Sequence, residues 1–537
     1  MRRPPMARAV TLLLAAIGAA VALVILRQRN LYEDEWLSLA FIQKPMGELW
    51  RWTIECGCHP PGALALDRLA LLGLGTARGI AAVHLAVWFA CMVFFVLRAG
   101  RLLRSDWGRA GFAAAALMHP QLLMWAGTIR WYGVWWGVAL VVLAVGLLPG
   151  RSDRAPSWAV TGALGLAGAL LLYLDYLAFI FLPCFGVAWL VRYGPSRASA
   201  ARVLAITAIS SAVAWPVVTT FPGQQALAQC SAEVANQVAA TFQMLHGLSI
   251  GQAIMPWHPV GVIVLVGLLL PSLWGLVRGL IGRLREPAPA HPAARRELAA
   301  LVIFLALMLA AAIASGLGTK PRSFLGLTAL VSLQLAIGAE HLRARPWRAL
   351  AAALAVLWIA TGAYHLIART GTAKRQLNDR PEQVIARLEQ IADGGPALVL
   401  TSNLILTFEI NQRRAQGRTP LVMGSIWNDP VHGFPAGLPA DAMRLPWVIV
   451  LAEAEVGSTA PDPGRVALSA ARRMIADERR EDVGWDPDWQ RKSRLAGQQL
   501  EPYRFRLWYG RPRPGDWRPV DARLQAAARG TILGENF

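Results

Sequence analysis

Apolar runs long enough to cross a lipid bilayer recur through the first two thirds of this 537-residue chain. The first is TLLLAAIGAAVALVIL, residues 11–26. About eleven such runs of roughly 17–23 residues can be counted, which is the length that a bilayer core requires. Their centres lie near residues 18, 88, 117, 140, 166, 184, 212, 268, 307, 332 and 357. The sequence therefore predicts a polytopic α-helical membrane protein with about eleven transmembrane helices.

The composition excludes an ordinary soluble domain, because 55% of the residues are hydrophobic and only 16% are charged. A net charge of +20 would suggest nucleic acid as the partner of a soluble protein. Here the basic residues cluster between the apolar runs, where membrane topology explains them, so no nucleic-acid partner is predicted. The first run lacks a cleavage site of small residues after it, which predicts a retained helix rather than a signal peptide.

The basic residues also predict the orientation of the chain. They concentrate in alternate connections, such as 98–109, 192–202 and 278–296, and this asymmetry places the N-terminus in the cytoplasm. Arg27 and Arg29 are exceptions to the rule. With an odd number of spans, everything after about residue 367 lies outside an inner (plasma) membrane, in the periplasm or the extracellular space.

The first external loop, residues 27–75, contains most of the polar groups that suggest chemistry. LYEDEWLSL, residues 31–39, places Glu33, Asp34 and Glu35 directly after the first span. CGCHPPG follows, and then ALALDRLALLGLG, residues 63–75, which is too short and too charged to span. That segment predicts a helix lying in the membrane interface. Another predicted external loop, GLGTKPRSF, covers 316–324.

The last third of the chain has a different character, because charges and prolines rise and the long apolar runs cease. Short apolar runs predict strands at ALVLT, 397–401, at PWVIVL, 446–451, and at YRFRLWYG, 503–510. LILTFEINQRRAQ, 404–416, has helical spacing. We therefore predict two domains, a transmembrane domain over 1–366 and an external α/β domain over 367–537.

Four stretches, taken in order, resemble one family of membrane enzymes. They are the loop with the Asp34-Glu35 pair followed by HPPGALALDRLALL, then HPQLLMWAGTIRWYGVWWGVAL, LLLYLDYLAFIFLP and GTKPRSFLGLTALVSL. The combination resembles the polyprenol-phosphate-sugar-dependent membrane glycosyltransferases of the C-type fold, including protein O-mannosyltransferases and lipid A aminoarabinose transferase. The resemblance covers about residues 1–366. Three positions depart from the family pattern: Thr128 where an acid is common, Asp175 where a His is common, and Ser323 where a Tyr is common.

The resemblance implies inverting transfer of a sugar from a polyprenyl-phosphate donor to a hydroxyl of a lipid, glycan or protein. Departure of the phosphate requires cations where negative charge accumulates, and the acceptor hydroxyl requires a carboxylate that takes its proton. Asp34 is the predicted base or metal ligand, with Glu35 in support. The predicted ligands of the donor phosphate are Arg130, Lys320 and Arg322, at the external ends of three spans.

Other residues have a functional and a structural interpretation. Glu55 and Asp34 could hold a divalent metal, Mg or Mn, since hard cations favour carboxylate oxygens, but Glu55 could equally pair with Arg51. No other cofactor is predicted. His59 is a donor contact or a cap, and Tyr132 is a site residue or part of an interfacial aromatic belt. Asp175 is a site residue or a hydrogen-bonding group within the bundle, and the three cations could instead be anchors to lipid headgroups.

Two other function classes stay open on the sequence alone. A transporter or flippase of lipid-linked sugars would need polar residues through the membrane midplane and two accessible faces. A catalytically degenerate subunit of envelope assembly would keep the fold without the chemistry. The candidate polar groups collect on one predicted side, which favours the enzyme.

Overall fold

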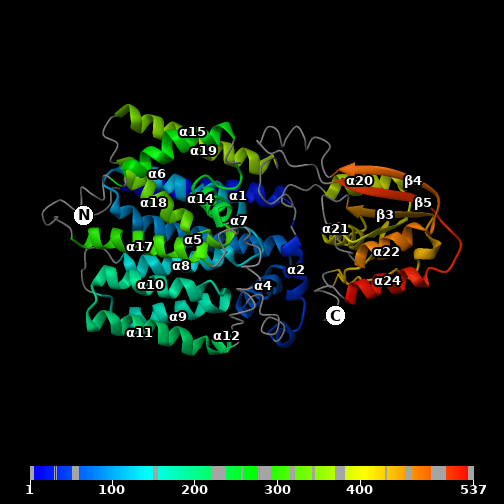
Figure 1. The fold of residues 1–537 in the computed structure, drawn as a ribbon, viewed down its shortest axis with the longest axis horizontal. Coiled ribbons are helices and arrows are strands. Elements are labelled where there is room, and N and C mark those ends of the chain that lie inside the picture. The colour runs from blue at the N-terminus through cyan, green and yellow to red at the C-terminus, as the bar shows by residue number, and fades with distance from the viewer. Residues whose placement is uncertain are drawn as a thin grey trace. The chain divides into compact units, whose positions relative to one another are not determined.

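The computed structural model describes residues 5–29, 31, 33–50, 60–148, 155–219, 237–254, 258–275, 277, 292–314, 321–340, 345–368, 381–429, 432–453, 463–484 and 504–529. The chain forms two compact units, one helical and one α/β (Figure 1). The helical unit comprises Met1–Gln28 and Pro45–Ala373, and the α/β unit comprises Arg29–Lys44 and Lys374–Phe537.

The helical unit contains almost only helices in its described part. They are α1 (Pro5–Gln28), α4 (Pro61–Leu74), α5 (Ala77–Ala99), η1 (Gly100–Leu102), α6 (Asp106–Leu117), α7 (Pro120–Trp125), α8 (Tyr132–Leu147), α9 (Trp158–Leu174), α10 (Ala178–Tyr193), α11 (Arg197–Val213), α12 (Trp215–Thr219), α14 (Gln237–Ser249), α15 (Pro259–Val264), η2 (Leu265–Leu269), α17 (Pro292–Ala314), η4 (Pro321–Phe324), α18 (Leu327–Glu340) and α19 (Arg345–Ile367).

Each predicted span centre lies in one of these helices. Within the described residues, four helical segments are long and apolar enough to cross a membrane: Arg8–Gln28, Ala77–Leu102, Arg295–Ala314 and Ala349–Ile367. Five further apolar helices are shorter, at 10–17 residues. The helical nature of the runs is confirmed, and the number that crosses the bilayer stays a prediction.

Helix α4 forms in the loop where an interfacial helix was predicted. Pro61 at its first position and Gly75 at φ 67° after its last residue mark its two ends. One side of the helix is buried, with Ala63, Leu64 and Asp67, whereas the leucines of the other side are exposed: Leu66, Leu69, Leu72 and Leu74. Exposed leucines on a short helix fit the membrane interface, and that location stays a prediction.

The α/β unit is built on one five-stranded sheet. Its elements are α2 (Glu33–Ile42), α20 (Pro381–Ile391), β1 (Ala397–Thr401), α21 (Leu404–Ala415), β2 (Leu421–Ser425), η6 (Ala442–Arg444), β3 (Trp447–Glu453), α22 (Pro463–Arg472), β4 (Ile475–Gly484), β5 (Arg504–Pro512) and α24 (Arg518–Arg529). The strand order is β2-β1-β3-β5-β4. β1 pairs in parallel with β2 and β3, whereas β5 pairs antiparallel with β3 and β4.

The centre of the sheet is buried on both faces, which explains why β1 is an unbroken apolar run. Leu398 and Val448 belong to one core cluster with Leu468 of α22 and Leu524 of α24. The predicted strands at 397–401, 446–451 and 503–510 correspond to β1, β3 and β5, and the predicted helix corresponds to α21.

One segment belongs to a different unit from the one that its sequence position suggests. Residues 29–44 follow the first long helix, yet they cluster with the C-terminal unit. Trp36 of α2 is buried there, with its ring centroid 5.1 Å from that of Phe408 on α21 and 6.0 Å from that of His432. Burial of this large ring supplies the apolar contact that holds α2 in the α/β unit.

Candidate functional site

Arg322 and Tyr132, which belong to two different stretches of the sequence, lie together in the helical unit. The Cζ atom of Arg322 lies 5.5 Å from the Trp125 ring centroid and 5.9 Å from the Tyr132 ring centroid. Trp136 of α8 donates from Nε1 to the Ser323 carbonyl oxygen at 2.8 Å, which fixes η4 against α8. A guanidinium at these distances from aromatic ring centroids makes cation–π interactions, which hold the Arg322 side chain in place.

Arg130 and Asp175 belong to the same neighbourhood. Arg130 lies in the turn between α7 and α8, and its guanidinium interacts electrostatically with the Asp175 carboxylate. Asp175 is buried and follows the last residue of α9. Its Oδ1 also accepts a hydrogen bond from the Leu177 backbone N–H at 2.7 Å. Asp175 therefore interacts both with the backbone of the bundle and with Arg130, and its role as a site residue stays a prediction.

Sequence reasoning missed a buried pair beside this turn, Asp67 and His84. Asp67 Oδ1 lies 2.6 Å from His84 Nε2. The other ring nitrogen, Nδ1, lies 3.0 Å from the Thr128 carbonyl oxygen and 3.1 Å from the Arg130 carbonyl oxygen. The only signals in the sequence are an acid in an apolar short helix and a histidine in an apolar run. Neither indicates that the two meet.

Aromatic rings surround the start of α8. The Trp131 and Tyr132 ring centroids are 4.2 Å apart, and those of Trp125 and Tyr132 are 6.4 Å apart. Arg322 thus lies over two of these large rings, and a guanidinium group matches the oxygens of a phosphate by its planar fork. The arrangement is suited to an anionic group that is attached to an apolar chain.

The acidic cluster is in the α/β unit, where Glu33, Asp34 and Glu35 are the first three residues of α2. Carboxylates in the first turn of a helix interact favourably with its dipole. Glu35 is fully buried, and both of its oxygens accept from Arg29, at 2.5 Å from Nη1 and 2.7 Å from Nη2. Arg29, an exception in the charge pattern of the loops, therefore has a bidentate partner. The side chain of Asp34 lies outside what the structure describes.

Three predicted site residues lie outside the described residues altogether: Lys320, Glu55 and His59. Their roles stay predictions. Within the described ranges, no group of three or more His, Cys, Asp or Glu side chains could hold a metal ion. The metal site predicted from Asp34 and Glu55 involves side chains outside that part of the chain.

No family model matches the sequence, and no curated protein is detectably similar to it. Among solved structures, the chain is similar to ArnT from Cupriavidus metallidurans in the apo state, with a TM-score of 0.50 and 13% identity. The similarity covers 93% of this chain and 97% of that one. The chain has the C-type glycosyltransferase fold. The resemblance seen in its sequence motifs is confirmed at the level of the fold.

Two further structures are similar at lower scores. ArnT from the same organism bound to undecaprenyl phosphate has a TM-score of 0.47 at 14% identity, covering 93% of this chain and 97% of that one. The Archaeoglobus fulgidus oligosaccharyltransferase in complex with Zn and sulfate has a TM-score of 0.44 at 11% identity, covering 81% and 67%. A membrane location is supported by the ArnT-like fold together with the four long apolar helices.

Proposed function

We propose that this chain is a glycosyltransferase that moves a sugar from a polyprenyl-phosphate donor to a hydroxyl acceptor at the external surface of the inner membrane. The observation that carries the proposal is the Arg322 guanidinium over the Trp125 and Tyr132 rings, in a chain of this fold that also has Arg130 in the turn before α8. ArnT, whose fold the chain shares, also has a structure with undecaprenyl phosphate bound. The acceptor is a lipid, a glycan or a protein.

The proposed reaction is inverting and has one step. The acceptor oxygen attacks the anomeric carbon from the face opposite the phosphate, and the bond between that carbon and the phosphate oxygen breaks. The electron pair leaves with the polyprenyl phosphate, which gains negative charge. Arg130, Lys320 and Arg322 stabilise this charge in the proposal, because preorganised cations act most strongly where charge develops in the transition state.

Asp34 is the proposed general base, which accepts the proton of the acceptor hydroxyl as the new bond forms. Glu35 has a supporting role in this proposal, since both of its oxygens are bound to Arg29. The two hydrogen bonds from Arg29 secure Glu35 in the first turn of α2.

The proposed orientation places the N-terminus in the cytoplasm and the C-terminal unit outside. A topology reporter fused after Phe537 or after residue 230 is expected to be active outside, and one fused near residue 289 is expected to be active inside. A cytoplasmic C-terminus would contradict the proposal that the candidate site residues all lie on the external side of the membrane.

The experiment that tests the function is a transfer assay with purified protein in lipid and a panel of polyprenyl-phosphate sugars. Asp34→Asn is expected to lower turnover by about 100-fold, the scale of lost general-base catalysis, with donor binding retained. Glu33→Gln is the matched control and is expected to change little. Equal effects of the two substitutions would exclude Asp34 as the base. Mass spectrometry of envelope lipids and glycans, with and without the protein, would identify the acceptor.

A further inference from the structure

Asp67 and His84 are polar side chains in apolar helices, and both are buried, at 3% and 4% exposure. Asp67 lies on the buried side of α4, and His84 lies in the first half of α5. A buried carboxylate or imidazole is strongly destabilising unless each polar atom has a partner. A function that requires this carboxylate–imidazole pair would explain why both groups are buried here.

The hydrogen bonds determine where the protons are. Carbonyl oxygens only accept, so His84 Nδ1, which faces the carbonyls of Thr128 and Arg130, must carry a proton. A second proton lies between His84 Nε2 and Asp67 Oδ1, which are 2.6 Å apart. The carboxylate fixes the ring orientation through one nitrogen, and the ring donates to the backbone through the other.

The backbone that receives this donation is the irregular segment between α7, which ends at Trp125, and α8, which begins at Tyr132. Carbonyls outside regular helix lack intrahelical donors and need other partners. One imidazole N–H serves two of them, those of Thr128 and Arg130. The ring therefore fixes the peptide units immediately around the Arg130 side chain.

We propose that Asp67 and His84 are positioning residues for Arg130: the imidazole N–H holds the backbone from Thr128 to Arg130, and Asp67 holds the imidazole. The pair does not touch the donor. It sets the direction in which the Arg130 guanidinium meets the donor phosphate. This inference rests on the proposed function, in which Arg130 binds that phosphate.

The test is a double-mutant cycle on the purified full-length protein in lipid nanodiscs, with polyprenyl phosphate itself as the probe. His84→Phe keeps an aromatic ring of similar size and removes the donor. We expect it to weaken binding of polyprenyl phosphate about tenfold or more. In the Arg130→Ala background, His84→Phe is expected to cause no further loss, because its effect passes through the side chain already removed.

Two further variants guard against general damage to the fold. His84→Gln retains an amide N–H that can reach a carbonyl, and we expect it to restore part of the affinity lost in His84→Phe. His365→Phe removes another buried histidine, in α19, and is expected to leave the affinity unchanged. Asp67→Ala is expected to weaken binding of polyprenyl phosphate, as His84→Phe does. In the Arg130→Ala background, Asp67→Ala is expected to cause no further loss of affinity.

Additive losses in the double variant would overturn the inference, since they would mean that the pair only stabilises the bundle. Unchanged polyprenyl-phosphate affinity in Arg130→Ala would overturn it as well. The proposed function fails in a different way, if the wild type binds polyprenyl phosphate but transfers sugar from no donor. In that case the binding cycle still decides whether Asp67 and His84 act through Arg130.

Discussion

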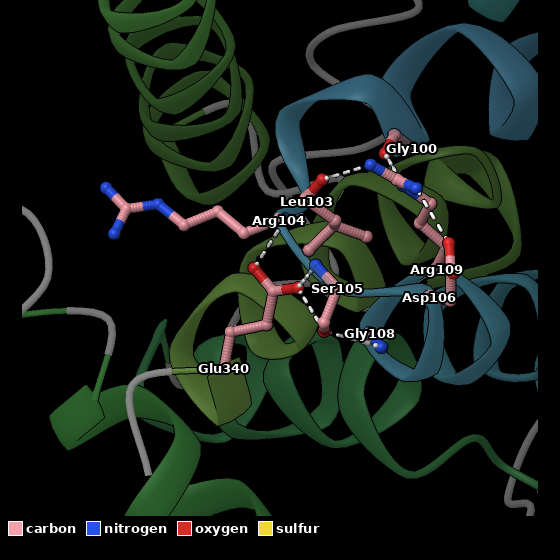
Figure 2. A network of polar contacts seen from close by, with 8 residues as sticks. All are labelled: Gly100, Leu103, Arg104, Ser105, Asp106, Gly108, Arg109 and Glu340. Atoms are coloured by element: carbon pink, nitrogen blue, oxygen red, sulfur yellow. Dashed lines mark hydrogen bonds and ion pairs between the residues drawn. The ribbon is translucent and has the colours of Figure 1, made fainter. Parts of the chain in front are cut away.

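At each end of α5 a carboxylate from a neighbouring helix secures a loop, but the two arrangements differ in what they support. After the last residues of α5, Glu340 of α18 accepts hydrogen bonds from the backbone N–H groups of Arg104 and Ser105, at 3.0 and 2.7 Å, and from Ser105 Oγ at 2.6 Å (Figure 2). Ser105 is also the N-cap of α6 and accepts from the Gly108 N–H at 3.1 Å.

Glu340 links the C-terminus of α18 to the start of α6. A carboxylate at the C-terminus of α18 would oppose that helix dipole, and its position at the start of α6 offsets this because the N-terminus of a helix favours negative charge. Arg109 adds contacts to Asp106, Gly100 and Leu103 (Figure 2). Both Glu340 oxygens accept from the loop before α6, whereas the Gly100 and Leu103 carbonyl oxygens accept from Arg109 of α6.

At the other end of α5, Asp67 contacts His84, and the His84 ring contacts the loop that contains Arg130. The difference teaches how a structural carboxylate can be distinguished from one that supports a site. Glu340 binds backbone directly, and the side chain of the adjacent Arg104 is exposed. Asp67 acts through an oriented ring, and the side chain of the adjacent Arg130 lies near Asp175 in the candidate site.

The largest expected effect is at Arg322, whose guanidinium lies over the Trp125 and Tyr132 rings. Arg322→Ala is expected to weaken binding of polyprenyl phosphate by roughly 10- to 100-fold, because the phosphate loses a hydrogen bond to a charged group. Arg322→Lys should restore only part of this, since an ammonium cannot reproduce the planar fork. Arg104→Ala, at the Glu340 end, is the matched control and should bind normally. If Arg322→Ala also binds normally, Arg322 is a headgroup anchor.

A smaller effect is expected from the structural carboxylate. Glu340→Gln replaces one acceptor oxygen by an amide N–H that faces the donors of Arg104 and Ser105. The free energy of unfolding is expected to fall by about 1–2 kcal/mol, with no change in polyprenyl-phosphate affinity. Thermal unfolding of the purified chain and a binding titration measure the two quantities. If Glu340→Gln lowers the polyprenyl-phosphate affinity without lowering the stability, Glu340 supports the candidate site and is not a purely structural carboxylate.

The smallest effect on stability is expected from an exposed ion pair, Arg472 and Glu478. Hydrogen bonding to Arg472 lowers the pKa of Glu478 in the α/β unit below its usual value, and both side chains are partly exposed. Because folding lowers this pKa, the pair stabilises the folded chain above the unfolded pKa, about 4.3. The contribution disappears as the pH falls through the lower folded pKa.

Glu478→Gln is accordingly expected to destabilise the chain at pH 7 by roughly 0.5 kcal/mol or less, since solvent screens an exposed pair. The difference from wild type should shrink as the pH falls through the lowered pKa of Glu478, and it should vanish at a pH low enough to protonate the carboxyl in both states. Unfolding temperatures of both proteins at the two pH values provide the measurement. A difference that persists at low pH would mean that Glu478 stabilises the strand by packing rather than by charge.

The sequence predicted the elements that a single physical requirement dictates. A segment in lipid must be apolar and must satisfy its backbone internally, and each predicted span centre lies in a helix of the described residues. A central parallel strand is buried on both faces, so ALVLT identified β1. Strand β4, IADERREDVG, lies at the sheet edge and is mostly polar, and no hydrophobic pattern could identify it.

The sequence suggested candidate site residues by their type and position, but it could not predict how they are arranged. Arg322 and Tyr132 were singled out by residue type and position, and the structure brings them to the same aromatic cluster. The pairing of Asp67 with His84 depends on how α4 packs against α5, which residue spacing does not encode. The Arg29–Glu35 pair and the contact of Trp36 with Phe408 depend likewise on tertiary packing.

The discontinuity of the α/β unit has a consequence for the order of synthesis. Trp36 of α2 leaves the ribosome about 370 residues before Phe408, the ring on which it packs. At translation rates of about 5–20 residues per second, the acidic helix waits roughly 20 to 70 seconds for its partner. During that interval the segment that begins with Glu33, Asp34 and Glu35 has no folded unit to join. A nascent chain therefore cannot complete this unit until synthesis is nearly finished.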